Sequence, residues 1–413
     1  MLIHRFSVLF RKHSVFVWVV IAVAVLKLIL SAVEPASYDM YSIVSLVVNN
    51  KNPLVGPWLA LYPSIYLGMM NSAPMVLQQW YLASPVNTNY NFQLLSLLLR
   101  LPVYLLDIAV LIAIYFVGKR KATPEVGRLA GLLWFLNPFT LFSVELIGVP
   151  DVAVTLLVVA ALGLIISRRP ILSGIFLAVG IWLKFYPILL LIPLLLYARS
   201  QGLSLRKMVA MLGLSLVGLF GYLSWVLPFG FFYLARYSPV TQPLPFISGG
   251  ESVVDYSAFV LIAFYCLLGL FAKKVKSPLP LLISTLLVYY LVSNPSPQYL
   301  VWVMPFMALD LAISKDRFKS VIFVSFYALA FTQWFFNSSA FLTPSRYSLL
   351  MISFIGNLSW YSQAIANFLD WSQVKLIGVL LLPLISSGFY ASAFIYVVEE
   401  SRSWFGASKY SQP

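Results

Sequence analysis

The sequence predicts an all-α protein, a polytopic integral membrane helix bundle. The chain of 413 residues is 61% hydrophobic and only 10% charged, whereas a soluble domain carries about 25% charged residues. Its mean hydropathy is +0.91. Apolar runs of about 17–25 residues recur along the chain, which is the length that crosses a bilayer as a helix. The polar surface is too small to cover a soluble globule.

The formal net charge is +14, but its distribution argues against a nucleic-acid partner. Most basic residues stand in short clusters between apolar runs, which is the pattern of cytoplasmic loops. Cys266, the single cysteine, lies inside an apolar run, so no disulfide framework forms within the chain. We keep the first apolar run, 14–33, as a membrane span, because it is longer than the core of a signal peptide.

We expect about 12 spans, with a range of 11–13. The expected spans are 14–33, 92–117, 128–147, 151–167, the two arms of 171–198, 208–228, 256–272, 279–293, 299–313, 320–336 and 376–397. The moderately apolar stretch 346–370 is either one more span or an amphipathic helix at the outer surface. We favour the second interpretation, which places Glu399, Glu400 and the C-terminus on the cytoplasmic side.

The chain is treated as one transmembrane domain, 1–413, with three parts. A long first outer loop, 34–91, is rich in aromatic residues, proline and asparagine. The core spans follow over 92–228, and the C-terminal spans occupy 229–413. The outer segments are 34–91, 148–150, 228–255, 294–298 and 337–375. Because the first of them is the richest in polar and aromatic residues, we expect function on this outer face.

The stretch 171–198 has basic residues at both ends, so it begins and ends on the cytoplasmic side and forms a hairpin. Its turn is Lys184-Phe-Tyr-Pro187, where proline ends a helix. Each arm of about 13 residues reaches roughly 20 Å, less than the bilayer core of about 30 Å. The turn therefore stops short of the outer surface. A lysine at that depth is tolerated beside a cavity, which predicts an outward-facing cavity lined by Lys184.

Asp39 is the first candidate for chemistry. It follows the first span in Ser37-Tyr-Asp-Met-Tyr41, with Tyr62-Pro63 further on. A carboxylate beside an outward cavity can take a proton from an attacking sugar hydroxyl. The simpler interpretation is an aspartate that caps a helix at the membrane surface.

Asp151 and Lys184 form the second candidate pair. Asp151 opens the fourth span, and the chain then enters and returns to Lys184, so both residues lie near the same outer face. They mark either a functional site or an ion pair that orders the hairpin. An N-cap role for Asp151 and a snorkelling role for Lys184 are the alternatives for each residue alone.

The remaining charged candidates lie within or between the spans. Arg100 and Asp107 share a face of the second span. Arg100 could meet a lipid phosphate, while Asp107 is expected to be structural, with Lys27 as a partner or a snorkelling residue. Outside, Arg236 and Arg346 are candidates for phosphate binding. Gln298, Tyr299 and Trp302 could bind and stack on a sugar, or belong to an interfacial aromatic belt.

These motifs together are similar to a known family. The chain resembles the GT-C superfamily of membrane glycosyltransferases, and within it the catalytic subunit of the first GPI mannosyltransferase and its prokaryotic relatives. The resemblance rests on four segments, namely Ser37 to Tyr41 with Tyr62-Pro63, Arg100-Leu-Pro to Asp107, Gly148-Val-Pro-Asp151 through Lys184-Phe-Tyr-Pro187, and Pro297-Gln-Tyr-Leu-Val-Trp302. It covers the first half of the chain well and the second half at one short motif.

The resemblance implies an inverting transferase that moves a hexose, with mannose as the expected sugar, from a polyprenyl-phosphate (dolichyl-phosphate) donor to a lipid-linked or glycan acceptor. Asp39 would then be the catalytic base, and Arg100, Lys184, Arg236 and Arg346 would bind the donor phosphate. Asp151, Tyr38, Tyr41, Tyr62, Tyr186, Gln298, Tyr299 and Trp302 would support the substrate. The relatives carry Asp-x-Asp in the first loop where this chain has Asp39-Met-Tyr41, so no metal is firmly predicted.

Two other functions stay open at this point. The chain could be a transporter or flippase of polyprenyl-linked lipids, which would use the same phosphate-binding cavity without chemistry. It could also be a non-catalytic membrane subunit, in which Asp39 and Lys184 are dispensable. Besides membrane lipids, the expected partners are the donor and the acceptor. The expected location is the plasma membrane of a prokaryote with the site outward, or the ER membrane with a lumenal site in a eukaryote.

Overall fold

The described part of the protein is entirely helical. The computed structural model describes residues 13–32, 88–141, 144, 151–226, 256–271, 275, 277–292, 297–337 and 371–404. Within these ranges there is no strand, and most helices are apolar. Segments Arg100–Lys121 and Leu205–Ser224 are long and apolar enough to cross a membrane, and shorter apolar helices accompany them. The prediction of an all-α membrane helix bundle is confirmed.

Fifteen helical elements follow one another in the described chain. They are α2 (His13–Ala32), α5 (Thr88–Lys121), α6 (Pro124–Phe135), α7 (Pro138–Thr140), α8 (Asp151–Ile166), α9 (Pro170–Leu183), the 3₁₀ helix η4 (Tyr186–Leu190), α10 (Leu191–Ser200), α11 (Leu205–Val226), α13 (Tyr256–Phe271), α14 (Leu279–Val292), the 3₁₀ helix η6 (Pro297–Trp302), α15 (Met304–Ser314), α16 (Arg317–Asn337) and α20 (Trp371–Trp404).

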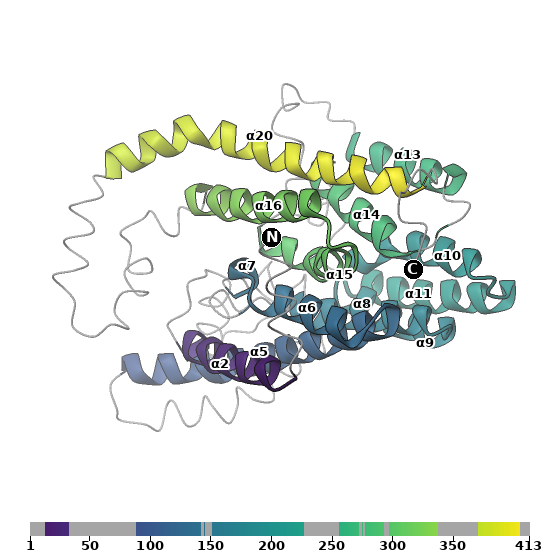
Figure 1. Cartoon of the computed structure of the whole chain (residues 1–413), viewed down its shortest axis with the longest axis horizontal. Coiled ribbons are helices and arrows are strands. Elements are labelled where there is room, and N and C mark those ends of the chain that lie inside the picture. The colour runs from purple at the N-terminus through teal and green to yellow at the C-terminus, as the bar shows by residue number, and fades with distance from the viewer. Residues whose placement is uncertain are drawn as a thin grey trace.

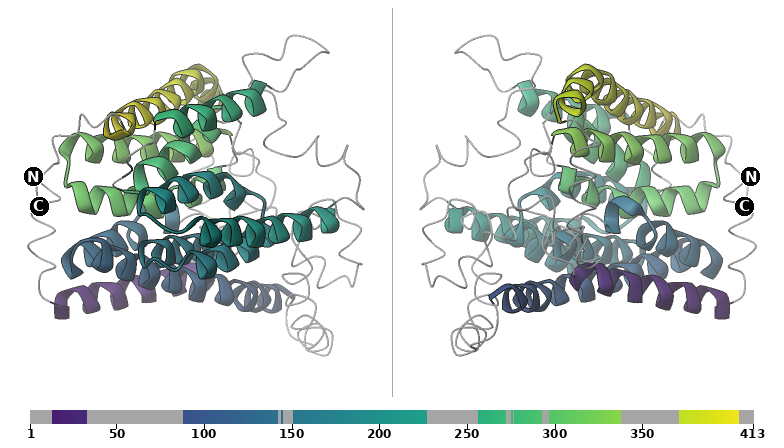
Figure 2. Two further views of the ribbon diagram at one scale, coloured as in Figure 1. Left: turned by 90° about the vertical axis from the view of Figure 1, so that its right-hand side faces the viewer. Right: turned by 90° about the vertical axis from the view of Figure 1, so that its left-hand side faces the viewer.

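The helices stack in layers that broadly follow the order of the chain. In Figure 1 the layers run from α2 and α5 on one side, through α6, α8, α9 and α11, to α16 and α20 on the other. Figure 2 shows the same order from both sides. Helix α5 packs against α2, α6 and α8, while α9 packs against α8 and α11, and α20 covers α14 and α16. Helices α2 and α11 expose apolar side chains such as Trp18 and Phe220, as lipid-facing surfaces do.

The third expected span, 128–147, is not one continuous helix. Helix α6 ends at Phe135, and Asn137 begins the short α7 by accepting a hydrogen bond from the backbone N–H of Phe139 at 2.8 Å. Pro138 cannot donate the N–H that would continue α6, so the helix breaks before it. The amide of Asn137 also reaches Met304 Sδ at 3.1 Å, which ties the break to α15. Apolar length alone hid this break.

The stretch 171–198 is divided at Lys184. Helix α9 ends there because Lys184 has extended backbone angles, and η4 and α10 follow. The ring of Pro187 lies 3.5 Å from the position that a Cβ on Gly180 would occupy, so the chain folds back onto α9. At the other end of the stretch, Tyr197 lies under the ammonium of Lys121 and near the charge of Arg168. Both ends of the stretch therefore lie at the end of the bundle that carries these basic residues.

Helices α16 and α20 run antiparallel. Lys319 at the start of α16 meets Glu400 near the end of α20, and the rings of Phe326 and Phe389 stack at 4.8 Å further along. The described ends that flank residues 338–370 therefore lie at the same end of the bundle. A count of 12 spans requires this arrangement, whereas 13 spans would place them at opposite ends.

Helices α9 and α11 approach each other so closely at two glycines that no larger residue would fit there. A Cβ added to Gly218 would stand 2.2 Å from the carbonyl oxygen of Ala178, and one added to Gly174 would stand 2.9 Å from Cα of Met211. Glycine is therefore needed at both positions for the contact between backbones, as small residues are at many interfaces between membrane helices.

Replacing Gly218 by valine is expected to force α9 and α11 apart. Overpacking of this kind costs about 1–3 kcal/mol or more, so the melting temperature of the purified protein in detergent should fall clearly. Gly213→Val is the matched control on the same helix, because nothing lies within 4 Å of the position of a Cβ at Gly213. Equal melting temperatures for the two variants would contradict the close contact.

Candidate functional site

Asp151 and Lys184 form an ion pair, as the order of spans suggested. Lys184 Nζ lies 2.7 Å from Asp151 Oδ1. Asp151 opens α8, where its charge also stabilises the positive end of the helix. Lys184 stands at the break after α9. The carboxylate has no exposed surface, and 15% of the lysine side chain is exposed, so the pair joins a buried acid to a base at the edge of the core.

Trp302 joins this pair from η6. Its indole N–H donates to Asp151 Oδ1 at 2.7 Å. The indole ring stacks on Tyr186 with centroids 3.9 Å apart and 6° between the planes, and on Tyr299 at 4.5 Å and 21°. Lys184 Nζ lies 4.6 Å from the centroid of the Tyr299 ring. We refer to Asp151, Lys184, Tyr186, Tyr299 and Trp302 as the Asp151 cluster.

The Asp151 cluster connects three separate parts of the chain. Residues of α8, of the turn between α9 and η4, and of η6 meet in it, and the hydroxyl of Tyr290 on α14 donates to the carbonyl oxygen of Tyr299. Thr155 lies 3.5 Å from the hydroxyl of Tyr186. Asp151 Oδ2 is buried and has no hydrogen-bond partner among the described residues. Lys184 and Trp302 therefore bind one oxygen of Asp151, Oδ1, and this contact holds the turn at Lys184 in place.

A second buried pair anchors the first span. Lys27 Nζ lies 2.6 Å from Asp107 Oδ2, and the indole N–H of Trp134 donates to Asp107 Oδ1 at 2.7 Å. Lys27 also lies 4.4 Å from the centroid of the Phe135 ring. Neither Lys27 nor Asp107 has exposed side-chain surface. Lys27 is therefore the partner of Asp107 and not a snorkelling residue, and Asp107 has the structural role that was expected.

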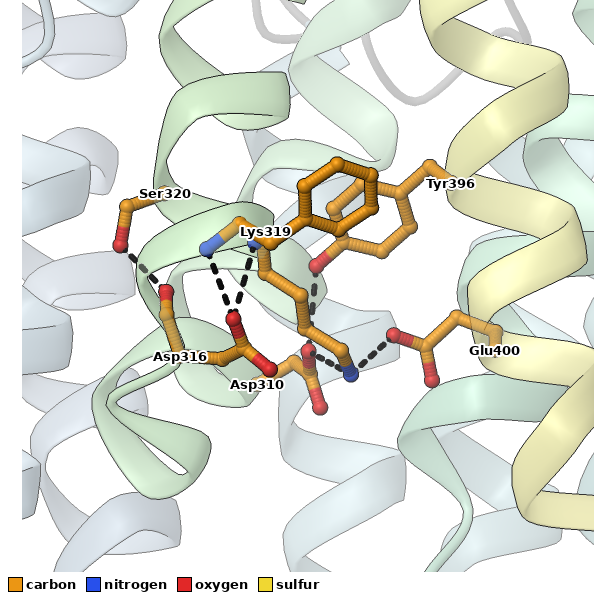
Figure 3. Close-up of polar contacts among 7 residues, drawn as sticks. Asp310, Asp316, Lys319, Ser320, Tyr396 and Glu400 are labelled. Atoms are coloured by element: carbon orange, nitrogen blue, oxygen red, sulfur yellow. Dashed lines mark hydrogen bonds and ion pairs between the residues drawn. The ribbon is translucent and has the colours of Figure 1, made fainter. Parts of the chain in front are cut away.

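A third buried cluster, in the last third of the chain, was not expected. Figure 3 shows Lys319 between Asp310 and Glu400, with Tyr396 above them. Lys319 Nζ lies 2.8 Å from Asp310 Oδ2 and pairs with Glu400 Oε1. The hydroxyl of Tyr396 donates to Asp310 Oδ2 at 3.1 Å. This Lys319 cluster joins α15, α16 and α20 at one end of the bundle.

Two charges at the ends of expected spans indicate the Lys319 cluster in the sequence. Lys319 stands directly before an expected span, and Glu400 lies just beyond the last one, 376–397. Opposite charges at adjacent ends of two spans are candidates for pairing. We used them only to count spans, because neither lies inside an apolar run.

Glu400 should make stability depend on pH. Burial, together with the nearby carboxylate of Asp310, raises the pKa of Glu400 to about 8 from an ordinary value of 4.5. The folded protein therefore holds a proton that the unfolded chain has lost at neutral pH. The stability from this group is complete below about 4.5 and is lost as the pH rises through about 8.

The melting temperature of the wild type is therefore expected to fall between pH 5 and pH 9 more steeply than that of Glu400→Gln, which mimics the protonated acid. The difference in melting temperature between the two proteins at each pH cancels the effect of other groups that titrate. Parallel curves for wild type and variant would show that Glu400 does not titrate in this range.

The remaining candidates divide into two groups. Arg100 lies on α5 with 1% of its surface exposed. Asp39, Tyr38, Tyr41, Tyr62, Arg236 and Arg346 lie outside the described residues, as does the side chain of Gln298. Their roles stay predictions, and so does the outward cavity. Among the described residues there is no group of three acids, histidines or cysteines that could hold a metal ion.

The described residues define a helical membrane protein in which three buried acid–base clusters join distant helices. The chain belongs to the family of the GPI transamidase subunit PIG-U. The model of that family matches residues 20–249, which is more than half of the sequence and runs from α2 past the end of α11. A search of curated proteins returns no match.

This finding overturns the assignment to glycosyltransferases. The PIG-U family is described as a transamidase subunit, so the resemblance to mannosyltransferases and the prediction of a transferase enzyme were wrong. The predictions of a polyprenyl-phosphate (dolichyl-phosphate) sugar donor and a glycan acceptor as partners were wrong for the same reason. Asp151, Lys184 and Trp302, which belong to these motifs, do lie together, but a group of polar residues does not determine the chemistry. A prokaryotic plasma membrane has no support either.

Proposed function

We propose that this chain is a non-catalytic membrane subunit of a GPI transamidase. The observation that carries the proposal is the match of residues 20–249 to the PIG-U family. A transamidase exchanges the amine of an amide bond, here for an amine of a GPI lipid, so its subunits must work beside a membrane. We place the chain in the ER membrane with the Asp151 cluster toward the lumen, which follows the eukaryotic alternative for its location.

The buried charges support a scaffolding role. An acid that acts as a base needs an oxygen free to accept a proton from the substrate. Both oxygens of Asp107 already accept hydrogen bonds from Lys27 and Trp134. Asp151 Oδ1 serves Lys184 and Trp302, while its Oδ2 is buried and has no hydrogen-bond partner among the described residues. These acids are used to hold helices together, which suits a subunit that presents a fixed surface to partner proteins.

We assign the Asp151 cluster the task of bracing that surface. It fixes the turn after α9 to η6, although these segments come from opposite halves of the chain. Stacked aromatic rings and a buried ion pair resist displacement more than a loop held by backbone contacts alone. The outer ends of α8, α9 and α15 would then keep one arrangement when other subunits bind to them.

Depletion of the chain in the cells that produce it tests the proposal. We expect a reporter with a GPI attachment signal to remain without its anchor, while complete GPI lipids accumulate. Tagged chain purified in mild detergent should carry transamidase activity with it. Wild-type chain should restore attachment. Failure to complete the GPI lipid itself would contradict the proposal, because it would place the chain in lipid synthesis instead of transfer.

A further inference from the structure

Two basic connections meet at one corner of the bundle. Helix α5 ends in Lys119, Arg120 and Lys121. The turn between α8 and α9 contains Arg168 and Arg169, and both are exposed. These two connections come together beside the end of α10, so positive charges that are separate in the sequence are close in the structure.

Tyr197 on α10 is the centre of this corner. Only 4% of its surface is exposed. Lys121 Nζ lies 5.8 Å from the centroid of its ring, and the charge of Arg168 acts on its hydroxyl. The hydroxyl of Ser200 lies 2.7 Å from the carbonyl oxygen of Tyr197 and 2.8 Å from that of Val275, so its one proton is shared between them and holds the end of α10. The tyrosine is thus a rigid support around which the cations are arranged.

The turn at Arg168 is held in an unusual conformation. Arg168 has a φ of 58°, a region that costs a residue other than glycine about 1–2 kcal/mol. Its backbone N–H donates to Ile165 O and that of Arg169 to Leu164 O, both at 2.9 Å. These hydrogen bonds hold the turn in one conformation. They keep Arg168 and Arg169 in the exposed connection between α8 and α9. No described acid pairs with either of them.

The same corner exposes apolar surface. Ile171 and Leu172 follow Arg169 after one proline, and their exposed fractions are 46% and 41%. Exposed apolar side chains contribute nothing to the binding of a free anion. A lipid, in contrast, carries a phosphate and acyl chains in one molecule. Basic side chains at the boundary of a span with exposed apolar side chains beside them fit an anionic phospholipid.

We propose that Lys121 and Arg168, arranged around Tyr197, bind the phosphate of an anionic phospholipid in the leaflet at this end of the bundle, with its acyl chains beside Ile171 and Leu172. Guanidinium groups present planar donors that match phosphate oxygens, and the lysine adds a second charge. The site lies at the end opposite the turn that carries Lys184. It is separate from the proposed transamidase role and does not depend on it.

Purified protein in neutral detergent, titrated with short-chain lipids, tests the proposal. We expect dioctanoyl phosphatidylinositol to raise the melting temperature with saturation, and dioctanoyl phosphatidylcholine to have little effect. In Lys121→Gln/Arg168→Gln the apparent affinity should fall by roughly tenfold or more. Arg206→Gln/Lys207→Gln is the matched control, because it removes two exposed charges from the first turn of α11 that have no described contact with Tyr197.

Four results would overturn the proposal. Equal loss of affinity in both double variants would show general attraction to a basic surface. Equal effects of the two lipids would remove the role of charge. A saturable rise with inorganic phosphate of the same size would identify a site for a free anion. Arg168→Gln alone serves as a second test variant, because an exposed side chain can be replaced without disturbing the core, and a normal affinity in it would also overturn the proposal.

Discussion

Replacing Asp107 by asparagine is expected to lower the free energy of unfolding by about 3–5 kcal/mol, the cost of leaving one partner of a buried ion pair without the other. The asparagine has nearly the same shape and can still accept from the indole of Trp134. The ammonium of Lys27, which has no exposed surface, would lose its charged partner 2.6 Å away. The melting temperature in detergent and the yield of monodisperse protein should both fall.

The double variant Lys27→Met/Asp107→Leu is the control for this prediction. It removes both charges and keeps the volume of the side chains, and such replacements are often neutral or stabilising. We expect it to recover most of the stability that Asp107→Asn loses. A double variant as unstable as the single one would mean that the site depends on the hydrogen bond to Trp134 and not on the balance of charge.

Replacing Lys184 by methionine should have the second largest effect, on stability and on GPI attachment together. It would leave the buried carboxylate of Asp151 without its cation and would remove the ammonium from the face of Tyr299. We expect a loss of about 2–4 kcal/mol, less than for Asp107 because part of the lysine side chain is exposed to solvent. The turn between α9 and η4 should then move away from η6.

Trp302→Phe separates the ion pair from the aromatic stack. It removes one hydrogen bond to Asp151 but retains a ring between Tyr186 and Tyr299, so a loss of only about 1–2 kcal/mol is expected. GPI attachment in cells rescued with each variant, measured against the amount of folded protein, provides the functional comparison. Normal attachment and stability in Lys184→Met would show that the Asp151 cluster does not hold the turn after α9 against η6.

The course of the chain could be predicted because charge and apolar length are strong constraints in a membrane. Basic residues on both sides of 171–198 required the chain to turn, and the proline at 187 located the turn. The proximity of Asp151 and Lys184 followed from counting crossings. The pairing of Lys27 with Asp107 was one of two interpretations, the other being a snorkelling lysine, and the cost of a lone charge in an apolar span is the physical reason for the pair.

Other features depend on tertiary contacts that leave no periodic pattern. Asn137 caps α7 and reaches Met304 at a distance of 167 positions in the sequence, so the break in the third expected span was hidden within an apolar run. Trp302 was expected to stack on a sugar or to belong to an interfacial aromatic belt, yet 2% of it is exposed and its N–H donates to Asp151. Nothing in a sequence distinguishes an aromatic residue at the membrane surface from one that is packed inside.

The error about function has a similar origin. Acids, lysines and tyrosines between spans suggested a transferase because such residues carry that chemistry in other proteins. In this chain the described ones bind each other. A polar group buried in an apolar bundle needs a partner whether or not any reaction takes place, so polarity in these segments could not tell a catalyst from a scaffold.

The partners in the buried clusters are far apart in the sequence, so they are synthesised at different times. Lys27 and Asp107 are 80 residues apart, and Asp151 and Trp302 are 151 apart. At a synthesis rate of about 5–20 residues per second, Asp151 waits roughly 8–30 s for the indole that completes its cluster. During this interval the nascent chain carries a half-satisfied charge in or near the bilayer. Ribosome stalling before Trp302 would therefore leave a product that the cell's quality control can recognise as unfinished.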